Sequence, residues 1–185
     1  MILGISSGFH DAAAAVISQQ GDILFAGHSE RYSKIKNDPN IHVDLLHAAM
    51  GYGTINHVAY YETPWKKQLR QLYSGQGIEW NKLSTRKILT EQFGEFSPVP
   101  NYSSHSHHLS HAAAGFQTST FDRATVVVID AIGEWDTISI YGAGYDSYGY
   151  AHYKKLWGQK YPHSIGLFYS AITKHVGLKP NEEEY

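Results

Sequence analysis

The chain has 185 residues, of which 42% are hydrophobic and 17% are charged, and it contains no cysteine. Because a domain averages about 100–200 residues, this length predicts one domain or one lobe of a larger protein, and the composition excludes a disordered chain. The 15 basic and 17 acidic residues give a formal net charge of −2, which disfavours a nucleic-acid-binding protein.

Other classes of protein are also excluded by what the sequence lacks. It has no apolar run of about 18 residues, so we expect no membrane-spanning helix. Its amino-terminal stretch lacks the basic start and long apolar segment of a signal peptide. The absence of cysteine excludes disulfides, thiolate metal sites and cysteine nucleophiles. We therefore expect a cytoplasmic α/β domain.

The amino-terminal third begins with three short apolar runs. Residues 1–6, 12–17 and 23–26 predict three strands joined by turns that contain glycine and aspartate. The first two runs are rich in small residues, which suits a backbone that approaches a ligand closely. The charged segment 30–40 ends in Asp-Pro-Asn, so we expect it to be a loop.

The middle of the chain predicts alternating helices and strands. Apolar residues at helical spacing predict a helix over 43–50, and a strand follows at 55–61. A helical turn is expected at 69–73, an amphipathic helix at 82–93, and a rigid proline-rich loop at 97–101.

The last third contains the strongest strand signal. An alanine-rich helix is expected over 107–116, followed by the run ATVVVID at 124–130, which is typical of a strand covered on both faces. Further strands are expected at 137–141 and near Tyr153, and a helix over 163–175. Together these elements predict an α/β fold.

Histidine is unusually frequent, with 12 copies, and four of them cluster at His105, His107, His108 and His111. On a helix, His107 and His111 are one turn apart and share a face, so both imidazoles can reach one metal ion. His108 is rotated away by about 100° and is expected to lie outside this set. The alternative is a pair of solvent-exposed histidines.

Asp130 stands where the predicted strand 124–130 ends. A carboxylate at the carboxyl end of a central strand is a common position for a metal- or phosphate-handling acid. With His107 and His111 it would form a set of two histidines and one carboxylate, which suits Fe²⁺, or Zn²⁺ if four-coordinate. The alternative is an aspartate that caps a helix or turn.

Two further polar groups lie near the amino terminus. His10 and Asp11 follow a glycine in the first turn and could face a phosphate or substrate, although turn chemistry alone would explain them. The charged segment 30–36 ends in Lys36. Such charges usually form a solvated face, but a lysine on a loop that returns to the site could balance an anionic substrate.

Five segments, in this order, resemble the O-carbamoyltransferases typified by the nodulation and tobramycin-biosynthesis enzymes. They are ILGISSGFHDAAAAV, ERYSKIKND, HHLSHAAAGF, VVVIDAIGEWDT and YPHSIGLFYSAITKHVGLK. The order of the segments and the 19-residue interval from His111 to Asp130 make the match more specific than any single motif.

This resemblance implies an actin-like (ribonuclease-H-like) fold, an α/β architecture with a mixed sheet flanked by helices and two lobes around a nucleotide cleft. It also implies a smaller domain that makes carbamoyladenylate from ATP and carbamoyl phosphate. The actin-like domain would then transfer the carbamoyl group to a substrate hydroxyl at an iron- or zinc-type metal site.

Carried over by position, the resemblance assigns the metal to His107, His111 and Asp130. The remaining matched positions are expected to lie at the cofactor or to take part in catalysis: Gly8, Gly133, Glu134 and Trp135 for the cofactor, and Lys36, His10 and Asp11 for catalysis.

The sequence also departs from the family. Family members run to several hundred residues, and the closing segment 181–185 resembles the start of a nucleotide-site motif that normally continues. We therefore expect 1–185 to be a first lobe alone, without the second lobe and its further metal-binding aspartate, and inactive by itself. The expected partners are ATP, carbamoyl phosphate, a hydroxyl-bearing small molecule and a second polypeptide carrying the missing lobe. The alternatives are a non-catalytic metal- or nucleotide-binding remnant and a threonylcarbamoyl-transferase-like protein.

Overall fold

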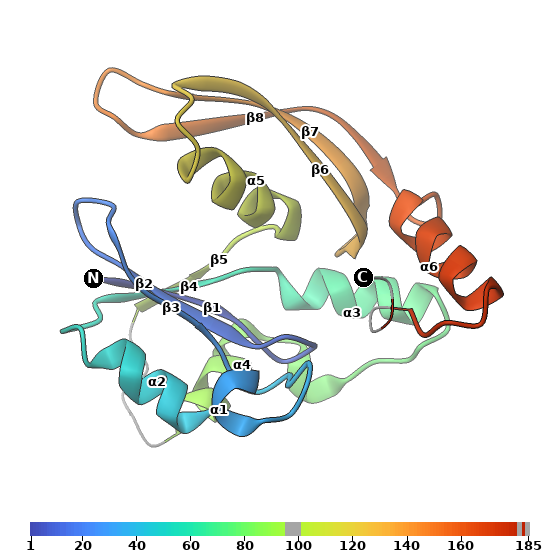
Figure 1. Ribbon diagram of the computed structural model, residues 1–185, viewed down its shortest axis with the longest axis horizontal. Helices are drawn as coiled ribbons and strands as arrows, with labels where there is room; N and C mark the ends of the chain where they lie inside the picture. The colour runs from blue at the N-terminus through green and yellow to red at the C-terminus, as the bar shows by residue number, and fades with distance from the viewer. Residues whose placement is uncertain (95–100, 181–182, 184–185) are drawn as a thin grey trace. The chain divides into compact units, whose positions relative to one another are not determined.

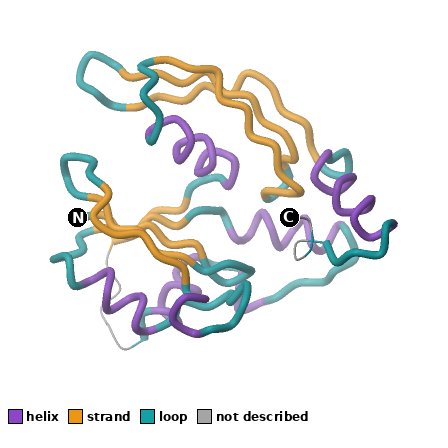
Figure 2. The backbone as a smooth tube through the Cα atoms, in the orientation of Figure 1, coloured by secondary structure: helices purple, strands orange, loops and turns teal. Residues whose placement is uncertain are grey.

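The computed structural model describes residues 1–94, 101–180 and 183 (Figure 1). The chain divides into two compact units, Met1–His105 and Ser106–Tyr185. The first contains a five-stranded sheet and the second a three-stranded sheet, and helices flank both (Figure 2). The expected α/β architecture with a mixed sheet flanked by helices is therefore confirmed.

The first sheet is mixed and has the strand order β3-β2-β1-β4-β5. Its strands are β1 Ile2–Ser6, β2 Ala13–Ile17, β3 Ile23–His28, β4 His57–Tyr60 and β5 Asn101–Ser104. The first three form an antiparallel meander, whereas β4 runs parallel to β1, and β5 runs parallel to β4. Gly4 pairs with Ala15 and Ala59 at the centre of this sheet. The small residues predicted from the sequence thus lie together on adjacent strands.

The helices of the first unit are α1 Glu30–Ser33, α2 Val43–Met50, α3 Pro64–Tyr73, the short 3₁₀ helix η1 Trp80–Lys82, and α4 Thr85–Gln92. Of these, α1, α2 and α4 gather on one face of the sheet, whereas α3 extends from the end of β4 (Figure 1). Leu45 and Leu46 of α2 and Leu89 of α4 are fully buried against Leu3 and Val16 of the sheet. This apolar layer is the core of the first unit, and it explains the helical periodicity that predicted α2 and α4.

Some elements of the first unit differ from the sequence-based predictions. The expected loop 30–40 begins with the short helix α1, and α3 is longer than the predicted turn because Pro64 starts it at a position where a missing N–H costs nothing. The predicted helix 82–93 starts at Thr85, after η1. The proline-rich loop expected at 97–101 lies outside the described residues except for Asn101, which begins the unpredicted strand β5.

The second unit is an antiparallel meander with two helices. Its elements are α5 His107–Gln117, β6 Arg123–Gly133, β7 Asp136–Tyr145, β8 Ala151–Lys160 and α6 Ile165–His175. The strand order is β6-β7-β8, and α5 lies along one face (Figure 1). Ala112 of α5 packs on Val128 and Tyr141, and all three are buried. All five elements were predicted from the sequence, although β7 is longer than expected.

The expectation that residues 124–130 are covered on both faces is wrong for the described residues. Val128 is 7% exposed, whereas its neighbours Val127 and Ile129 are 54% and 58% exposed. The strand alternates because α5 covers only one face of an antiparallel sheet. A continuous run of β-branched residues therefore predicted the strand correctly but not its surroundings.

No helix among the described residues is long and apolar enough to cross a membrane. The longest, α5 and α6, have 11 residues each. The sequence predicted no membrane-spanning helix, and none is found among the residues that the structure describes.

Candidate metal centre

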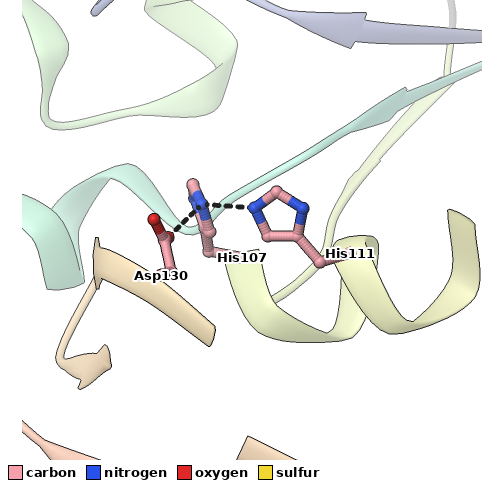
Figure 3. A group of neighbouring side chains, drawn as sticks. All are labelled: His107, His111 and Asp130. Atoms are coloured by element: carbon pink, nitrogen blue, oxygen red, sulfur yellow. Dashed lines mark hydrogen bonds and ion pairs between the residues drawn. The ribbon is translucent and has the colours of Figure 1, made fainter. Parts of the chain in front are cut away.

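The first turn of α5 and the end of β6 bring three ligand-type side chains together. In Figure 3, His107 lies between Asp130 and His111. Nε2 of His107 is 3.0 Å from Nε2 of His111 and 3.1 Å from Oδ2 of Asp130. One ligand atom from each residue lies within 4.8 Å of the other two. The structure therefore groups the three residues that the sequence selected as metal ligands.

Small residues allow the helix and the strand to approach this closely. A methyl group at Gly133 would lie 2.5 Å from Cδ2 of His107 and 2.6 Å from Cδ2 of His108. Carbon atoms in ordinary contact are about 3.5–4.0 Å apart, so only glycine fits beside these imidazoles. Gly133, expected to bind cofactor, thus makes room for His107 and His108.

The end of β6 is also fixed by the start of α6. A methyl group at Gly166 would lie 2.6 Å from the backbone nitrogen of Ala131. The hydroxyl of Ser164 lies 3.2 Å from the carbonyl oxygen of Asp130 and 2.7 Å from that of Ala131, to which it donates. The Asp130 carboxylate itself accepts from the N–H of Ala131 at 2.6 Å. The backbone that carries the candidate ligand is therefore held on several sides.

The electrostatic environment favours the ligating forms of Asp130 and His111. Burial opposes the ionisation of Asp130, but the hydrogen bond and charge of His107 outweigh it and lower the pKa of Asp130 to about 2. Burial lowers the pKa of His111, and the neighbouring His107 lowers it further. An ionised carboxylate and a neutral imidazole are the forms that bind metal ions.

Two of the three donor separations match the spacing of ligands around a divalent metal ion. Two ligand atoms about 2.1 Å from one ion and at right angles to each other are about 3.0 Å apart. Nε2 of His107 lies 3.0 Å from Nε2 of His111 and 3.1 Å from Oδ2 of Asp130, which agrees with that spacing, and all three ligand atoms lie within 4.8 Å of one another. Two histidines and one carboxylate at adjacent positions match the ligand set of Fe²⁺ sites with open positions.

A fourth histidine, His108, was placed outside this set by the sequence analysis, yet it faces the same carboxylate. Its Nε2 lies 3.9 Å from Oδ2 of Asp130, and its Nδ1 lies 2.8 Å from the hydroxyl of Ser139. Burial lowers the pKa of His108 to about 4, although Asp136 and Asp130 oppose the shift. The spacing with Ala112 and Phe116, at i, i+4 and i+8, was a signal that His108 lies on the buried face of α5.

The other residues expected near the cofactor form the turn between β6 and β7. Glu134 is buried and has a φ of 57°, and the carbonyl of Trp135 accepts a hydrogen bond from the N–H of Tyr161 at 2.9 Å. This turn follows directly after Gly133. The structure thus places Glu134 and Trp135 next in sequence to the residue that contacts the histidines, and their cofactor role stays a prediction.

The predicted residues of the first unit also form a local group. His10 and Asp11 are exposed in the turn between β1 and β2, with Nδ1 of His10 3.0 Å from Oδ2 of Asp11. Gly8 has a φ of +90°, which favours glycine, and its N–H donates to the carbonyl of Pro39 at 2.7 Å. The segment that carries the exposed Lys36 therefore lies against this turn.

The comparisons with known proteins concern the segment that carries the candidate metal ligands. The family model described as "Carbamoyltransferase N-terminus" matches residues 80–185, more than half of the chain. The chain belongs to this family. The match includes His107, His111 and Asp130, and it confirms the resemblance to the amino-terminal region of O-carbamoyltransferases.

Curated relatives from bacteria and an archaeon match nearly the whole chain. The uncharacterised protein sll1178 of Synechocystis sp. is 32% identical over 100% of this chain and 33% of its own length. Nodulation protein NolNO of Sinorhizobium fredii is 27% identical over 95% of this chain and 27% of its own length. The uncharacterised protein MJ1058 of Methanocaldococcus jannaschii is 24% identical over 99% of this chain and 41% of its own length. The chain thus spans 27–41% of the length of these relatives.

Proposed function

We propose that this chain contributes the metal centre of a carbamoyltransferase that moves a carbamoyl group from carbamoyladenylate to a substrate hydroxyl. The observation that carries the proposal is the convergence of His107, His111 and Asp130 within the segment that matches the family. Because the chain spans 27–41% of the length of its relatives, the reaction is proposed for the whole protein. Adenylate formation from ATP and carbamoyl phosphate is assigned to parts outside this chain.

We also propose that the chain is the amino-terminal part of an actin-like domain. This proposal, in which the two compact units belong to two lobes, departs from the single lobe that the sequence analysis expected, and the recurrence of one strand motif in both units supports it. In each unit the first three strands form an antiparallel meander, and helices follow it: α1 and α2 after β3, and α6 after β8. In the first unit the chain then adds β4 parallel to β1.

The chemistry of the site follows from the donor atoms present. His107 and His111 would offer lone pairs on Nε2, and Asp130 a carboxylate oxygen, to a divalent iron or zinc ion. When bound, such an ion polarises the carbamoyl carbonyl and stabilises negative charge on its oxygen. Gly133 has no side chain to displace the imidazoles of His107 and His108. The hydroxyl of Ser164 donates to the carbonyl of Asp130 and so fixes the backbone there.

The turn of the first unit is proposed to handle the anionic part of the substrate. Gly8 gives this turn its shape, His10 and Asp11 present exposed polar side chains, and Lys36 offers a positive charge from the adjoining segment. A flexible ammonium group suits the binding of phosphate or carbamoyl oxygens as a point charge. Glu134 and Trp135 are proposed to contact the cofactor from the turn between β6 and β7.

The test is a transfer assay with the complete native protein loaded with Fe²⁺ or Zn²⁺. Carbamoyl phosphate and ATP are supplied with a panel of sugars and other hydroxyl-bearing small molecules, and AMP release and carbamoylated products are measured by liquid chromatography and mass spectrometry. We expect acceptor-dependent AMP release that His111→Ala abolishes. The matched control is His175→Ala, which removes an exposed histidine of the same unit and should leave the rate unchanged. Equal rates in the two variants, or no carbamoylated product from any acceptor, would contradict the proposal.

A further inference from the structure

His108 is a buried histidine beside the candidate ligands. Its side chain is 1% exposed and lies on the same face of α5 as Ala112 and Phe116, toward the sheet. Nδ1 lies 2.8 Å from the hydroxyl of the fully buried Ser139 on β7. Nε2 is buried and has no hydrogen-bond partner among the described residues. An unsatisfied buried polar atom is costly, which calls for a role for this nitrogen.

The surroundings of the ring select one tautomer. Nε2 points toward Oδ2 of Asp130, 3.9 Å away, and an ionised carboxylate can only accept hydrogen bonds. A proton on Nε2 is attracted to this oxygen, whereas a lone pair there would be repelled. The hydroxyl of Ser139 can donate to the unprotonated Nδ1, so the two neighbours together favour the Nε2–H form.

His108 is suited to orienting the metal ligand Asp130 rather than to binding the metal itself. The three converging residues are His107, His111 and Asp130, and His108 is not in that group. Oδ2 of Asp130 lies 3.1 Å from Nε2 of His107. A metal ion needs the lone pair of that nitrogen, so His107 can no longer donate to the carboxylate once it is a ligand. Among the described residues, His108 is a second buried histidine whose Nε2 lies near Oδ2 and can donate to it.

We propose that His108 is a positioning residue, whose Nε2–H donates to Oδ2 of Asp130 and fixes the orientation in which this carboxylate meets the metal. This inference rests on the proposed metal centre. Oδ1 of Asp130 is already held by the N–H of Ala131 at 2.6 Å, so a rotation of the carboxylate that brings Oδ2 closer by about 1 Å completes the bond. Hydrogen bonds to a ligating carboxylate typically raise metal affinity about 10–100-fold.

Two substitutions distinguish the contributions of the two ring nitrogens of His108. His108→Gln keeps a donor near the position of Nε2, whereas His108→Asn keeps a polar group near Nδ1 and Ser139 but loses the donor toward Asp130. Both leave a similar buried amide, so their stabilities in urea should fall by similar amounts. In calorimetric titrations with Zn²⁺, we expect His108→Asn to bind about 10–100-fold more weakly than the wild type and His108→Gln to stay within about tenfold. Equal losses of affinity in the two variants, or none in either, would overturn the positioning role.

A metal-free measurement tests the contact independently of the proposed function. Nitrogen-15 NMR of the imidazole rings should show His108 as the Nε2–H tautomer, and Asp130→Asn should shift the Nε2 signal. Asp146→Asn, which changes an exposed carboxylate that pairs with His152, is the matched control and should not shift it. An Nδ1–H tautomer, or a signal that Asp130→Asn leaves unchanged, would overturn the inference. A wild-type chain that shows the expected spectrum but binds no Zn²⁺ would instead contradict the proposed metal centre.

Discussion

Gly133→Ala tests how closely the helix and the strand must approach at the candidate metal centre. The added methyl carbon would lie 2.5 Å and 2.9 Å from Cδ2 and Cγ of His107, and 2.6 Å from Cδ2 of His108. Because ordinary carbon contacts are about 3.5–4.0 Å, both imidazoles would have to move by about 1 Å. Such overpacking of a buried position typically costs about 1–3 kcal/mol.

The same displacement should weaken metal binding far more than stability. Ligand distances in a metal site must hold to about 0.2 Å, so a shift of His107 by about 1 Å removes it from the ligand set. We therefore expect Gly133→Ala to lower the free energy of unfolding by about 2 kcal/mol in urea denaturation. In a calorimetric titration with Zn²⁺, its affinity should fall by at least about 100-fold.

A second glycine provides a control of opposite sign. Gly115 lies on α5, the helix that carries His107, but a methyl group there would meet no atom within 4 Å. Gly115→Ala should therefore stabilise the chain by about 0.5–1 kcal/mol through helix propensity and leave metal binding unchanged. A Gly133→Ala variant as stable as the wild type, with the same Zn²⁺ affinity, would refute the proposed steric role of Gly133.

Three further predictions concern stability. Gly166→Ala places a methyl group 2.6 Å from the backbone nitrogen of Ala131, which cannot rotate away as a side chain could. The free energy of unfolding in urea should therefore fall by at least about 2 kcal/mol. An unchanged urea midpoint would contradict the close approach of α6 to β6. Burial lowers the pKa of His108 to about 4, so as the pH falls the His108 imidazole is protonated in the unfolded chain before it is protonated in the folded chain. The free energy of unfolding of the chain without added metal should therefore fall by about 3 kcal/mol between pH 7 and pH 4. His108→Gln should flatten this pH dependence. Nζ of Lys67 lies 3.2 Å from a carboxylate oxygen of the fully buried Glu62, so Lys67→Met should lower the free energy of unfolding by about 3–5 kcal/mol. Adding Glu62→Gln should restore much of this loss, because it removes the unpaired buried charge. Equal stability of the single and double variants would show that the two charges are not coupled.

Much of the fold could be predicted because apolar residues recur at the period of the element they form. The helix 43–50 was predicted at its observed bounds, since Leu45, Leu46 and Ala49 mark its buried face. The strand β5 was missed because its residues, Asn-Tyr-Ser-Ser, carry no apolar alternation, and it exists through its pairing with β4. The exposed face of β6 could not be foreseen, because β-branched residues favour a strand whether or not a second layer covers it.

Part of the candidate site could also be predicted from the sequence, and part could not. His107 and His111 could be selected from their spacing on a helix, and Asp130 from the end of the predicted strand 124–130. The expected central strand that ends at Asp130 is wrong, because β6 is an edge strand that continues to Gly133. His108 was placed outside the ligand set, and the three converging residues do not include it. Its nearness to Asp130 was not predicted, because helix geometry gives the angle of His108 to His107 but not the position of the sheet. The steric role of Gly133 depends on distances across α5 and β6, which no local pattern contains.

The central claim is that His107, His111 and Asp130 bind a divalent metal, and metal titration of two proteins tests it most directly. Zn²⁺, and Fe²⁺ under anaerobic conditions, are titrated calorimetrically into the wild-type chain and into His111→Ala, with circular dichroism recorded for both. We predict one ion per wild-type chain, and no binding by His111→Ala with an unchanged dichroism spectrum. Metal retained at full stoichiometry by a folded His111→Ala variant would contradict the assignment.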